Sequence, residues 1–344
     1  MRRYFLISGL ILSVLLLTTG CNLFSSLSGG DDGPHYHHFY GMVEANDTLY
    51  ISAFEADKVT TVAMGEDINP EDFHAFEYPH GLAYGGGSSP DTNIWVCDLN
   101  DQSIKSYTGG SLDSTTMIGT EPVNMIFLPA QDNRRSAGLP RRILVADRME
   151  NCLHILSFNN DGTTLSQNEI ATKIDLSSYM EESAVAYIDM YLEGDLVYIV
   201  SNEFFGFLTI DIYDSDPVLT HHPFTGTQSI TEIGTDMGGM GIAVHDSLVY
   251  VNTGGRIIRS SPTGTDAEVL CSLSDLYPDN TGYYIDMVIS DSVRNEGYTP
   301  RFISPPTYIY VASGLFWDSP EVATHLVRCG LDGSNPMTLE LDNL

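Results

Sequence analysis

Short apolar runs recur along the chain in groups of three, separated by turn-forming residues. Each run has the length and the Val, Ile and Tyr content typical of a β-strand. The first run of each group aligns on a three-residue core, and six groups are visible. Their first cores are Gly41–Val43, Gly81–Ala83, Asn124–Ile126, Asp189–Tyr191, Gly241–Ala243 and Asp286–Val288.

The second and third runs follow each core in the same order. Second runs include IWVCD from Ile94 and VYVNT from Val249, and third runs include SIKSYT from Ser103. The aligned cores are 40 residues apart between Gly41 and Gly81 and 65 residues apart between Asn124 and Asp189. This spacing is close to the length of a four-stranded propeller blade.

The pattern predicts an all-β fold, a six-bladed β-propeller of four-stranded blades over residues 38–344. A closed ring buries the faces of each sheet against its neighbours and leaves few exposed strand edges. No long amphipathic helical pattern competes with the strands. Two stacked β-sandwich domains are the alternative that the same strand pattern allows.

The chain begins with the features of a signal peptide. Arg2 and Arg3 precede an almost wholly apolar run from Tyr4 to Leu17, which is shorter than the roughly 18 residues that a membrane-spanning helix needs. The segment LLLTTGC that ends at Cys21 resembles the lipobox of bacterial lipoproteins, although Thr18 stands where that motif usually has Leu. The resemblance implies removal of residues 1–20 and lipidation of Cys21. An ordinary secretory peptide is the alternative.

Residues 21–37 are expected to consist of the lipidated Cys21 and a flexible tether, because the residues after Cys21 are mostly small, polar and turn-forming. The protein is therefore expected in the cell envelope, held to a membrane through its N-terminal lipid. Asn22, rather than Asp, follows Cys21. In enterobacterial-type sorting this favours the outer over the inner membrane.

A formal net charge of −31 argues against nucleic acid as a partner, because such a surface repels phosphates. The acidity is explained equally by adaptation to salt or by a face that binds cations. Beyond Cys21 there are four cysteines, which permits a disulfide in an exported protein. They form no CxxC pair, so the sequence does not indicate a cysteine-rich zinc site.

The segment PHGLAYGGGSSPDTNIWVCDLNDQSIKSY from Pro79 resembles an NHL-type blade. Pro and Gly precede a short inner strand, the next strand ends in Val-x-Asp, and the third contains Ile. The run from Pro122 through ILVADRMENCLHILSFNNDG is similar, and the other four groups match more loosely. The resemblance implies a six-bladed propeller, a fold whose members include binding modules, lactonases and lyases.

No serine nucleophile elbow, P-loop, HExxH, dinucleotide-binding or EF-hand motif is present. In a propeller, however, the inner strands bring distant residues together around the central channel. Three aligned first positions carry oxygen-bearing side chains, namely Asn124, Asp189 and Asp286. Hard oxygen ligands of this kind suit Ca²⁺. The alternative is that they bind backbone NH groups at the start of each strand.

The set resembles that of the gluconolactonase and paraoxonase-like propellers, which hold a catalytic calcium with Glu, Asn and Asp. That resemblance implies Glu44 as the missing acid, three residues beyond its aligned position. His80, directly before Gly81, is a candidate general base or ligand near the same channel. An amidating-lyase-like zinc site would need several channel histidines, and the aligned positions supply no others.

Two functions follow from these observations. The first is a non-enzymatic envelope propeller that binds a protein, glycan or small molecule, which the repeat pattern without a catalytic motif favours. The alternative is a Ca²⁺-dependent lactonase or related hydrolase, in which Asn124, Asp189 and Asp286 hold the metal and His80 assists proton transfer.

Overall fold

The computed structural model describes fourteen stretches of the chain, all within a unit that runs from Tyr36 to Leu344. They are residues 39–53, 57–63, 70–76, 78–86, 92–118, 120–128, 142–158, 165–180, 187–214, 217–226, 238–273, 283–290, 307–314 and 325–340. The expected signal peptide, the lipidated Cys21 and the tether lie outside the described residues.

These residues form six antiparallel sheets of four strands each, which we call blades 1 to 6 in chain order. Within each blade the strands lie side by side in the order of the sequence. The first three blades are built as follows. Blade 1 contains β1 (Phe39–Ala45), β2 (Thr48–Ala53), β3 (Lys58–Ala63) and β4 (Pro70–Ala75); blade 2 contains β5 (Pro79–Gly86), β6 (Asn93–Asp98), β7 (Ser103–Thr108) and β8 (Ser111–Met117); blade 3 contains β9 (Pro122–Leu128), β10 (Arg142–Asp147), β11 (Cys152–Phe158) and β12 (Leu165–Asp175).

The second half of the unit repeats the arrangement. Blade 4 contains β13 (Ile188–Glu193), β14 (Leu196–Ser201), β15 (Phe207–Asp211) and β16 (Thr220–His222); blade 5 contains β17 (Gly241–His245), β18 (Leu248–Asn252), β19 (Arg256–Ser260) and β20 (Glu268–Ser272); blade 6 contains β21 (Tyr283–Ser290), β22 (Tyr308–Gly314), β23 (His325–Gly330) and β24 (Met337–Glu340).

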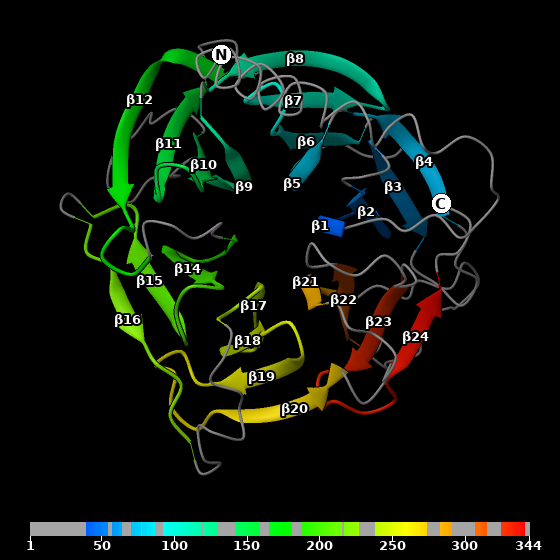
Figure 1. Ribbon diagram of the computed structural model, residues 1–344, viewed down its shortest axis with the longest axis vertical. Helices are drawn as coiled ribbons and strands as arrows, with labels where there is room; N and C mark the ends of the chain where they lie inside the picture. The colour runs from blue at the N-terminus through cyan, green and yellow to red at the C-terminus, as the bar shows by residue number, and fades with distance from the viewer. Residues whose placement is uncertain are drawn as a thin grey trace, which may run out of the picture. The chain divides into compact units, whose positions relative to one another are not determined.

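The six sheets close into a ring around a central axis, with the first strand of each blade innermost (Figure 1). Each inner strand contacts the inner strand of the next blade, from β1 to β5, β9, β13, β17 and β21, and β21 returns to β1. The predicted six-bladed β-propeller of four-stranded blades is therefore confirmed. The alternative of two stacked sandwiches is wrong, because all six sheets of the described residues belong to this ring.

The core is divided among the six blade interfaces, and strand alternation explains this division. On β10, Ile143 and Val145 join a buried cluster with Trp95 of blade 2, whereas Leu144 packs against blade 4 with Leu208. Successive side chains of a strand point to opposite faces of its sheet, so a strand buried on both sides reads as a continuous apolar run. This is why the second and third runs of each repeat stand out in the sequence.

The outermost strands are different, because one sheet edge faces solvent. In β8 only Thr116 is buried among the seven residues of the strand. The described cysteines, Cys97, Cys152, Cys271 and Cys329, are buried and are not joined in disulfides. Within the described ranges, no helix is long and apolar enough to cross a bilayer.

Candidate functional site

The aligned first positions of the inner strands meet around the axis at one level, and we call this set the collar. At each of the six blade junctions, a collar residue or its immediate neighbour contacts the next blade. The collar consists of Gly41, Gly81, Asn124, Asp189, Gly241 and Asp286.

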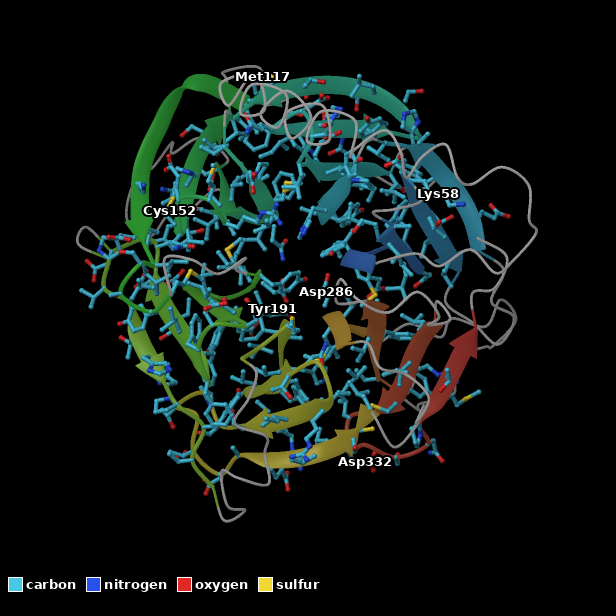
Figure 2. All side chains as sticks on the ribbon, in the orientation of Figure 1. Lys58, Met117, Cys152, Tyr191, Asp286 and Asp332 are labelled. Atoms are coloured by element: carbon cyan, nitrogen blue, oxygen red, sulfur yellow. The ribbon has the colours of Figure 1, made fainter. Side chains whose placement is uncertain are left out.

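Asp286 links blade 6 to blade 1 and closes the ring. Its Oδ2 accepts a hydrogen bond of 2.5 Å from the backbone N–H of Met42, and its Oδ1 accepts one of 2.6 Å from Met287 N–H. The side chain is buried at 5% exposure and lies beside the central axis (Figure 2). One carboxylate therefore binds amides on both sides of the junction.

Asn124 and Asp189 link blades 3, 4 and 5 in the same manner. The Asn124 Nδ2 donates to Asp189 Oδ1 at 2.5 Å, while Asn124 Oδ1 accepts from Met125 N–H at 2.7 Å. Asp189 Oδ1 also accepts from Met190 N–H at 2.8 Å, and Asp189 Oδ2 accepts from Ile242 N–H at 2.7 Å. The amide orientation of Asn124 follows from these two bonds, since one partner is an acceptor and the other a donor.

The glycines of the collar permit close approach of backbones. A Cβ at Gly81 would lie 2.5 Å from both the Val123 carbonyl oxygen and the Asn124 Cα. At Gly41 a Cβ would lie 2.7 Å from the His80 carbonyl oxygen, and at Gly241 it would lie 2.6 Å from Met287 N. Any side chain at these positions would hold the neighbouring blades apart.

The two collar carboxylates resist ionisation. Burial raises the pKa of Asp189 to about 7, against the opposing effect of hydrogen bonds from Ile242, Met190 and Asn124. Burial, together with the charge of Asp189, raises the pKa of Asp286 well above its ordinary value. Burial and the charges of both carboxylates also raise the pKa of Tyr187 well above its usual value, which places this phenol beside the pair.

His80 is buried at 2% exposure between aromatic rings. Its ring centroid lies 4.5 Å from that of Tyr40 and 6.1 Å from that of Tyr187. Its Nδ1 lies 2.7 Å from the Val123 carbonyl oxygen, so this nitrogen carries the proton and donates it. Burial lowers the pKa of His80 to about 3, although the Val123 bond opposes this. The imidazole is therefore neutral at physiological pH.

Tyr187 completes this part of the axis, and the sequence offered no signal for it. Its hydroxyl donates to the Tyr40 carbonyl oxygen at 3.0 Å, which joins residues of blades 1 and 4 across the ring. Tyr187 lies two residues before the aligned core of its repeat, whereas His80 lies directly before its own. The two residues therefore do not share an aligned position, and the repeat pattern did not indicate that they are neighbours.

Glu44 lies on β1 two residues beyond Met42, on the same face of the strand. Its charge contributes to the raised pKa of Tyr310 in blade 6, although burial is the larger cause. The structure therefore places Glu44 beside the interface of blades 1 and 6, whereas Asp286 binds the amide of Met42 nearer the axis.

The donor set of the collar can be compared with the needs of Ca²⁺, which takes six to eight oxygen ligands. Asn124, Asp189 and Asp286 are close together around the axis, as the sequence predicts. All five of their side-chain oxygens already accept backbone or amide N–H groups. In this arrangement the set does not fit a calcium ion, and we derive no chemical step through one. Their role as calcium ligands, with Glu44, stays a prediction.

A second polar cluster lies outside the collar, at the turn between β10 and β11 of blade 3. Glu150, Cys152 and His154 bring their ligand atoms within 4.8 Å of one another. The cluster matches neither the CxxC nor the HExxH spacing, so these motifs did not indicate it. The signal was Cys-x-His on one strand, which places both side chains on the same face.

Comparison with protein families and with curated proteins found no match for this sequence. Solved structures do match. A streptogramin B lyase structure is 13% identical, with a TM-score of 0.52, and the match covers 91% of this chain and 86% of the lyase. A virginiamycin B lyase from Staphylococcus aureus is 10% identical, with a TM-score of 0.48 and coverage of 90% and 86%.

A putative 6-phosphogluconolactonase from Bacteroides uniformis is 12% identical, with a TM-score of 0.47, and the match covers 88% of this chain and 80% of that one. At these identities a likeness describes the path of the chain and not its chemistry. Together with the closed ring of six sheets, the likeness to the streptogramin B lyase structure leads to one identification, which is that this chain has the fold of a six-bladed β-propeller.

Proposed function

We propose that this protein is a lipid-anchored propeller of the bacterial cell envelope that binds a protein, glycan or small molecule without transforming it. The observation that carries the proposal is that all side-chain oxygens of the collar already accept hydrogen bonds. The polar atoms that a catalyst in the channel would need bind the neighbouring blades instead. Binding is then assigned to the faces and loops of the ring.

The state of His80 supports the same assignment. A general base works best when its pKa lies near the operating pH. With a pKa of about 3, His80 is a weak base, and its protonated nitrogen is committed to the Val123 carbonyl. This residue contributes to the seam between blades 2 and 3.

The proposal is tested by immobilising the full-length, detergent-solubilised protein and exposing it to envelope extract. Retained molecules are identified by mass spectrometry. A variant with Asp189→Asn and Asp286→Asn serves as the matched comparison, because it alters the collar and leaves the outer faces unchanged. We expect both proteins to retain the same envelope component. Failure to retain any component, together with calcium-dependent lactone hydrolysis by the wild type, would overturn the proposal.

The second candidate is a Ca²⁺-dependent lactonase or related hydrolase. The observation that favours it is the pair of buried carboxylates, since like charges out of water are stabilised by a proton or a cation. Such a role requires Asp189 and Asp286 to exchange some amide partners for the ion. Calorimetric calcium titration of the wild type and the double Asn variant separates the two candidates. Equal, weak binding by both proteins would eliminate the hydrolase.

A further inference from the structure

Blades 2 and 3 each have an equivalent turn after the second strand, and each turn carries two carboxylates. Blade 2 shows how the negative charge of such a turn is balanced. Asp98 ends β6 with its side chain fully buried, and its Oδ1 accepts from Asp101 N–H at 3.1 Å. Lys105 on β7 places its ammonium 2.7 Å from Asp98 Oδ2 and 2.5 Å from Asp101 Oδ2. One cation thus bridges the two carboxylates of this turn.

Blade 3 has carboxylates at the same two positions, Asp147 and Glu150, and Lys173 of β12 forms an ion pair with Glu150 at 2.9 Å. Asp147 ends β10 with its side chain fully buried, and its Oδ1 accepts from Glu150 N–H at 2.8 Å. Strand register places Cys152 opposite Asp147 and His154 opposite Val145, as it places Ser103 opposite Asp98 and Lys105 opposite Val96. His154 therefore takes the position of the lysine, and Cys152 that of the serine.

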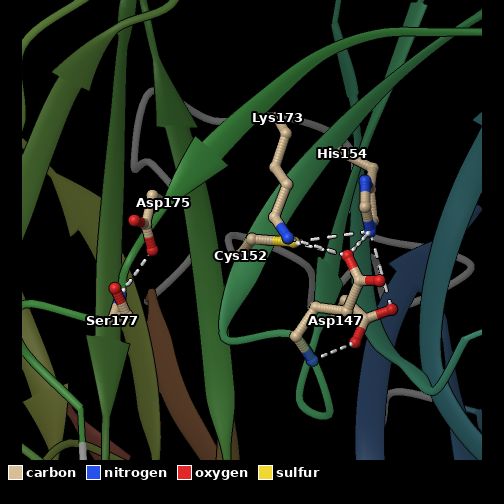
Figure 3. Close-up of polar contacts among 7 residues, drawn as sticks. Asp147, Cys152, His154, Lys173, Asp175 and Ser177 are labelled. Carbon is tan, nitrogen blue, oxygen red and sulfur yellow. Dashed lines mark hydrogen bonds and ion pairs between the residues drawn. The ribbon is translucent and has the colours of Figure 1, made fainter.

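Glu150, Cys152 and His154 thus bring their ligand atoms together near the position at which blade 2 holds an ammonium group, and Asp147 lies beside His154 (Figure 3). His154 Nε2 lies 3.4 Å from Cys152 Sγ, 3.7 Å from Glu150 Oε2 and 3.6 Å from Asp147 Oδ2. Cys152 Sγ lies 3.8 Å from Glu150 Oε2. A tetrahedral ion with N and O ligands at about 2.0 Å and one S ligand at about 2.3 Å separates the N and O atoms by about 3.3 Å and the S atom from them by about 3.5 Å. The four separations lie within about 0.4 Å of these values, so only small side-chain movements are needed to bind one ion.

An unsatisfied atom points to the same place. Asp147 Oδ2 is buried and makes no hydrogen bond within the described residues, and its neighbour in the cluster is His154 Nε2. Buried polar atoms nearly always have a hydrogen-bond or ionic partner, so this oxygen indicates a place for a cation.

We propose that Asp147, Glu150, Cys152 and His154 bind one Zn²⁺ ion at the seam between blades 2 and 3. Thiolate, imidazole and carboxylate together are ligands of this borderline-soft ion, and four protein ligands make a closed structural site. The ion takes the place that the Lys105 ammonium has in blade 2. Its role is to balance the buried charge and to stabilise the turn.

Binding exchanges a proton for the metal. Burial raises the pKa of the Cys152 thiol to about 12, and the charges of Asp147 and Glu150 contribute, so the free protein carries the S–H form. When Zn²⁺ binds, the S–H bond breaks, the Zn–S bond forms, and the proton leaves to solvent. Lys173, whose Nζ lies 2.9 Å from Glu150 Oε2, is about half exposed and competes with the ion for this carboxylate.

The test uses the full chain, stripped with a chelator and titrated with Co²⁺ as a spectroscopic substitute for Zn²⁺. We expect one equivalent of cobalt to bind with a thiolate-to-cobalt charge-transfer band, and Zn²⁺ to displace it. Cys152→Ser should abolish the band. Glu150→Gln should weaken cobalt binding by at least about tenfold, because mutation of a residue that only hydrogen-bonds to a metal ligand already lowers metal affinity by about that factor.

Matched controls separate this site from adventitious binding by an acidic protein. Asp101→Asn changes the equivalent turn position of blade 2, and Cys97→Ser removes a buried thiol outside the cluster. A variant without the N-terminal histidines removes a second source of metal binding; it carries His35→Ala, His37→Ala and His38→Ala. All three controls should bind cobalt like the wild type.

Glu150 is 40% exposed in a turn, so its substitution leaves folding intact, and the test does not depend on the stability of Cys152→Ser. The proposal is overturned if no charge-transfer band forms. It is equally overturned if Glu150→Gln and Asp101→Asn give the same isotherm as the wild type.

Discussion

At the scale of single residues, the collar depends on side chains that bind the backbone of the next blade. Asp286 has a φ of 62°, in the left-handed region that few residues other than Gly, Asn and Asp adopt. The strand pairing shifts register around it, between Ile285 and Met287. This local distortion turns the carboxylate toward blade 1.

Replacing Asp286 by Ala should therefore destabilise the ring. The change leaves the amides of Met42 and Met287 without their acceptor, and each buried unsatisfied group costs about 1 to 3 kcal/mol. We expect the free energy of unfolding to fall by about 2 to 4 kcal/mol, measured by chemical denaturation.

Asp332→Ala is the control, because Asp332 is exposed and accepts from the N–H of the equally exposed Ser334 at 2.9 Å, so its loss should cost about 0.5 kcal/mol or less. Similar losses in the two variants would contradict the role assigned to the collar.

The raised pKa of Asp189 predicts a dependence of stability on pH. In the folded protein Asp189 keeps its proton up to about pH 7, whereas in the unfolded chain it loses the proton near the ordinary pKa of 3.8 for aspartate. The folded state therefore binds more protons between these values, and its stability falls as pH rises through them. In the wild type, the melting temperature should decline from pH 5 to pH 7 more steeply than in Asp189→Asn. Parallel curves would refute this prediction.

At the scale of elements, the blades are held at close range by glycine on the inner strands. Gly81 on β5 faces the backbone of β9 at a distance that no Cβ can occupy. Some turns next to the outer strands impose the same demand, because a Cβ at Gly333, between β23 and β24, would lie 2.2 Å from the Leu270 carbonyl oxygen of β20. Close backbone contact between neighbouring blades therefore occurs near the axis and also at turns farther out.

Gly81→Ala should lower the free energy of unfolding by about 1 to 3 kcal/mol, because the backbones of blades 2 and 3 must separate. Gly255, in the turn between β18 and β19, has no atom near its would-be Cβ, so Gly255→Ala should leave stability unchanged within about 0.5 kcal/mol. Thermal melts monitored by circular dichroism compare the two. A melting temperature for Gly81→Ala equal to that of the wild type would show that the blades are not packed this closely.

At the scale of the whole molecule, stability comes from a closed cycle of blade interfaces, each with its own buried apolar cluster. The interface of blades 6 and 1, with Ile51 and Leu326, joins the last blade to the first. The opening of the ring would expose two such faces together, so ring closure makes the blades interdependent.

The proposed lipid anchor is tested on the whole protein in a bacterial host. Cys21→Ala removes the acceptor of the lipid, and we expect the protein to move from the membrane fraction to the soluble envelope fraction. Labelling with a fatty-acid analogue should mark the wild type only. A variant that stays membrane-bound would indicate that something other than lipid on Cys21 holds the protein.

Much of the fold could be predicted from the sequence, and the missing part has a physical reason. Strands buried on both faces, such as β10 and β14, are continuous apolar runs that can be recognised in isolation. The fourth strands, such as β8, are mostly exposed and carry no alternation. They were expected only because a blade requires them.

The candidate sites divide in a similar way. Alignment of the repeats predicted that Asn124, Asp189 and Asp286 are neighbours, because equivalent positions of the blades lie at the same height along the central axis. Alignment did not reveal what their oxygens bind, nor the presence of Tyr187 beside them. The cluster of Asp147, Glu150, Cys152 and His154 was also missed, since it spans a hairpin turn and matches no familiar metal-binding spacing.

The sequence by itself determined the number of repeats, the order of strands and the residues that line the axis, because strand periodicity and burial are local properties of the chain. Only the tertiary structure decided how those residues are used. Hydrogen-bond partners, close backbone contacts and pKa shifts depend on distances between segments far apart in the chain. Ring closure sets these distances, and no local pattern encodes them.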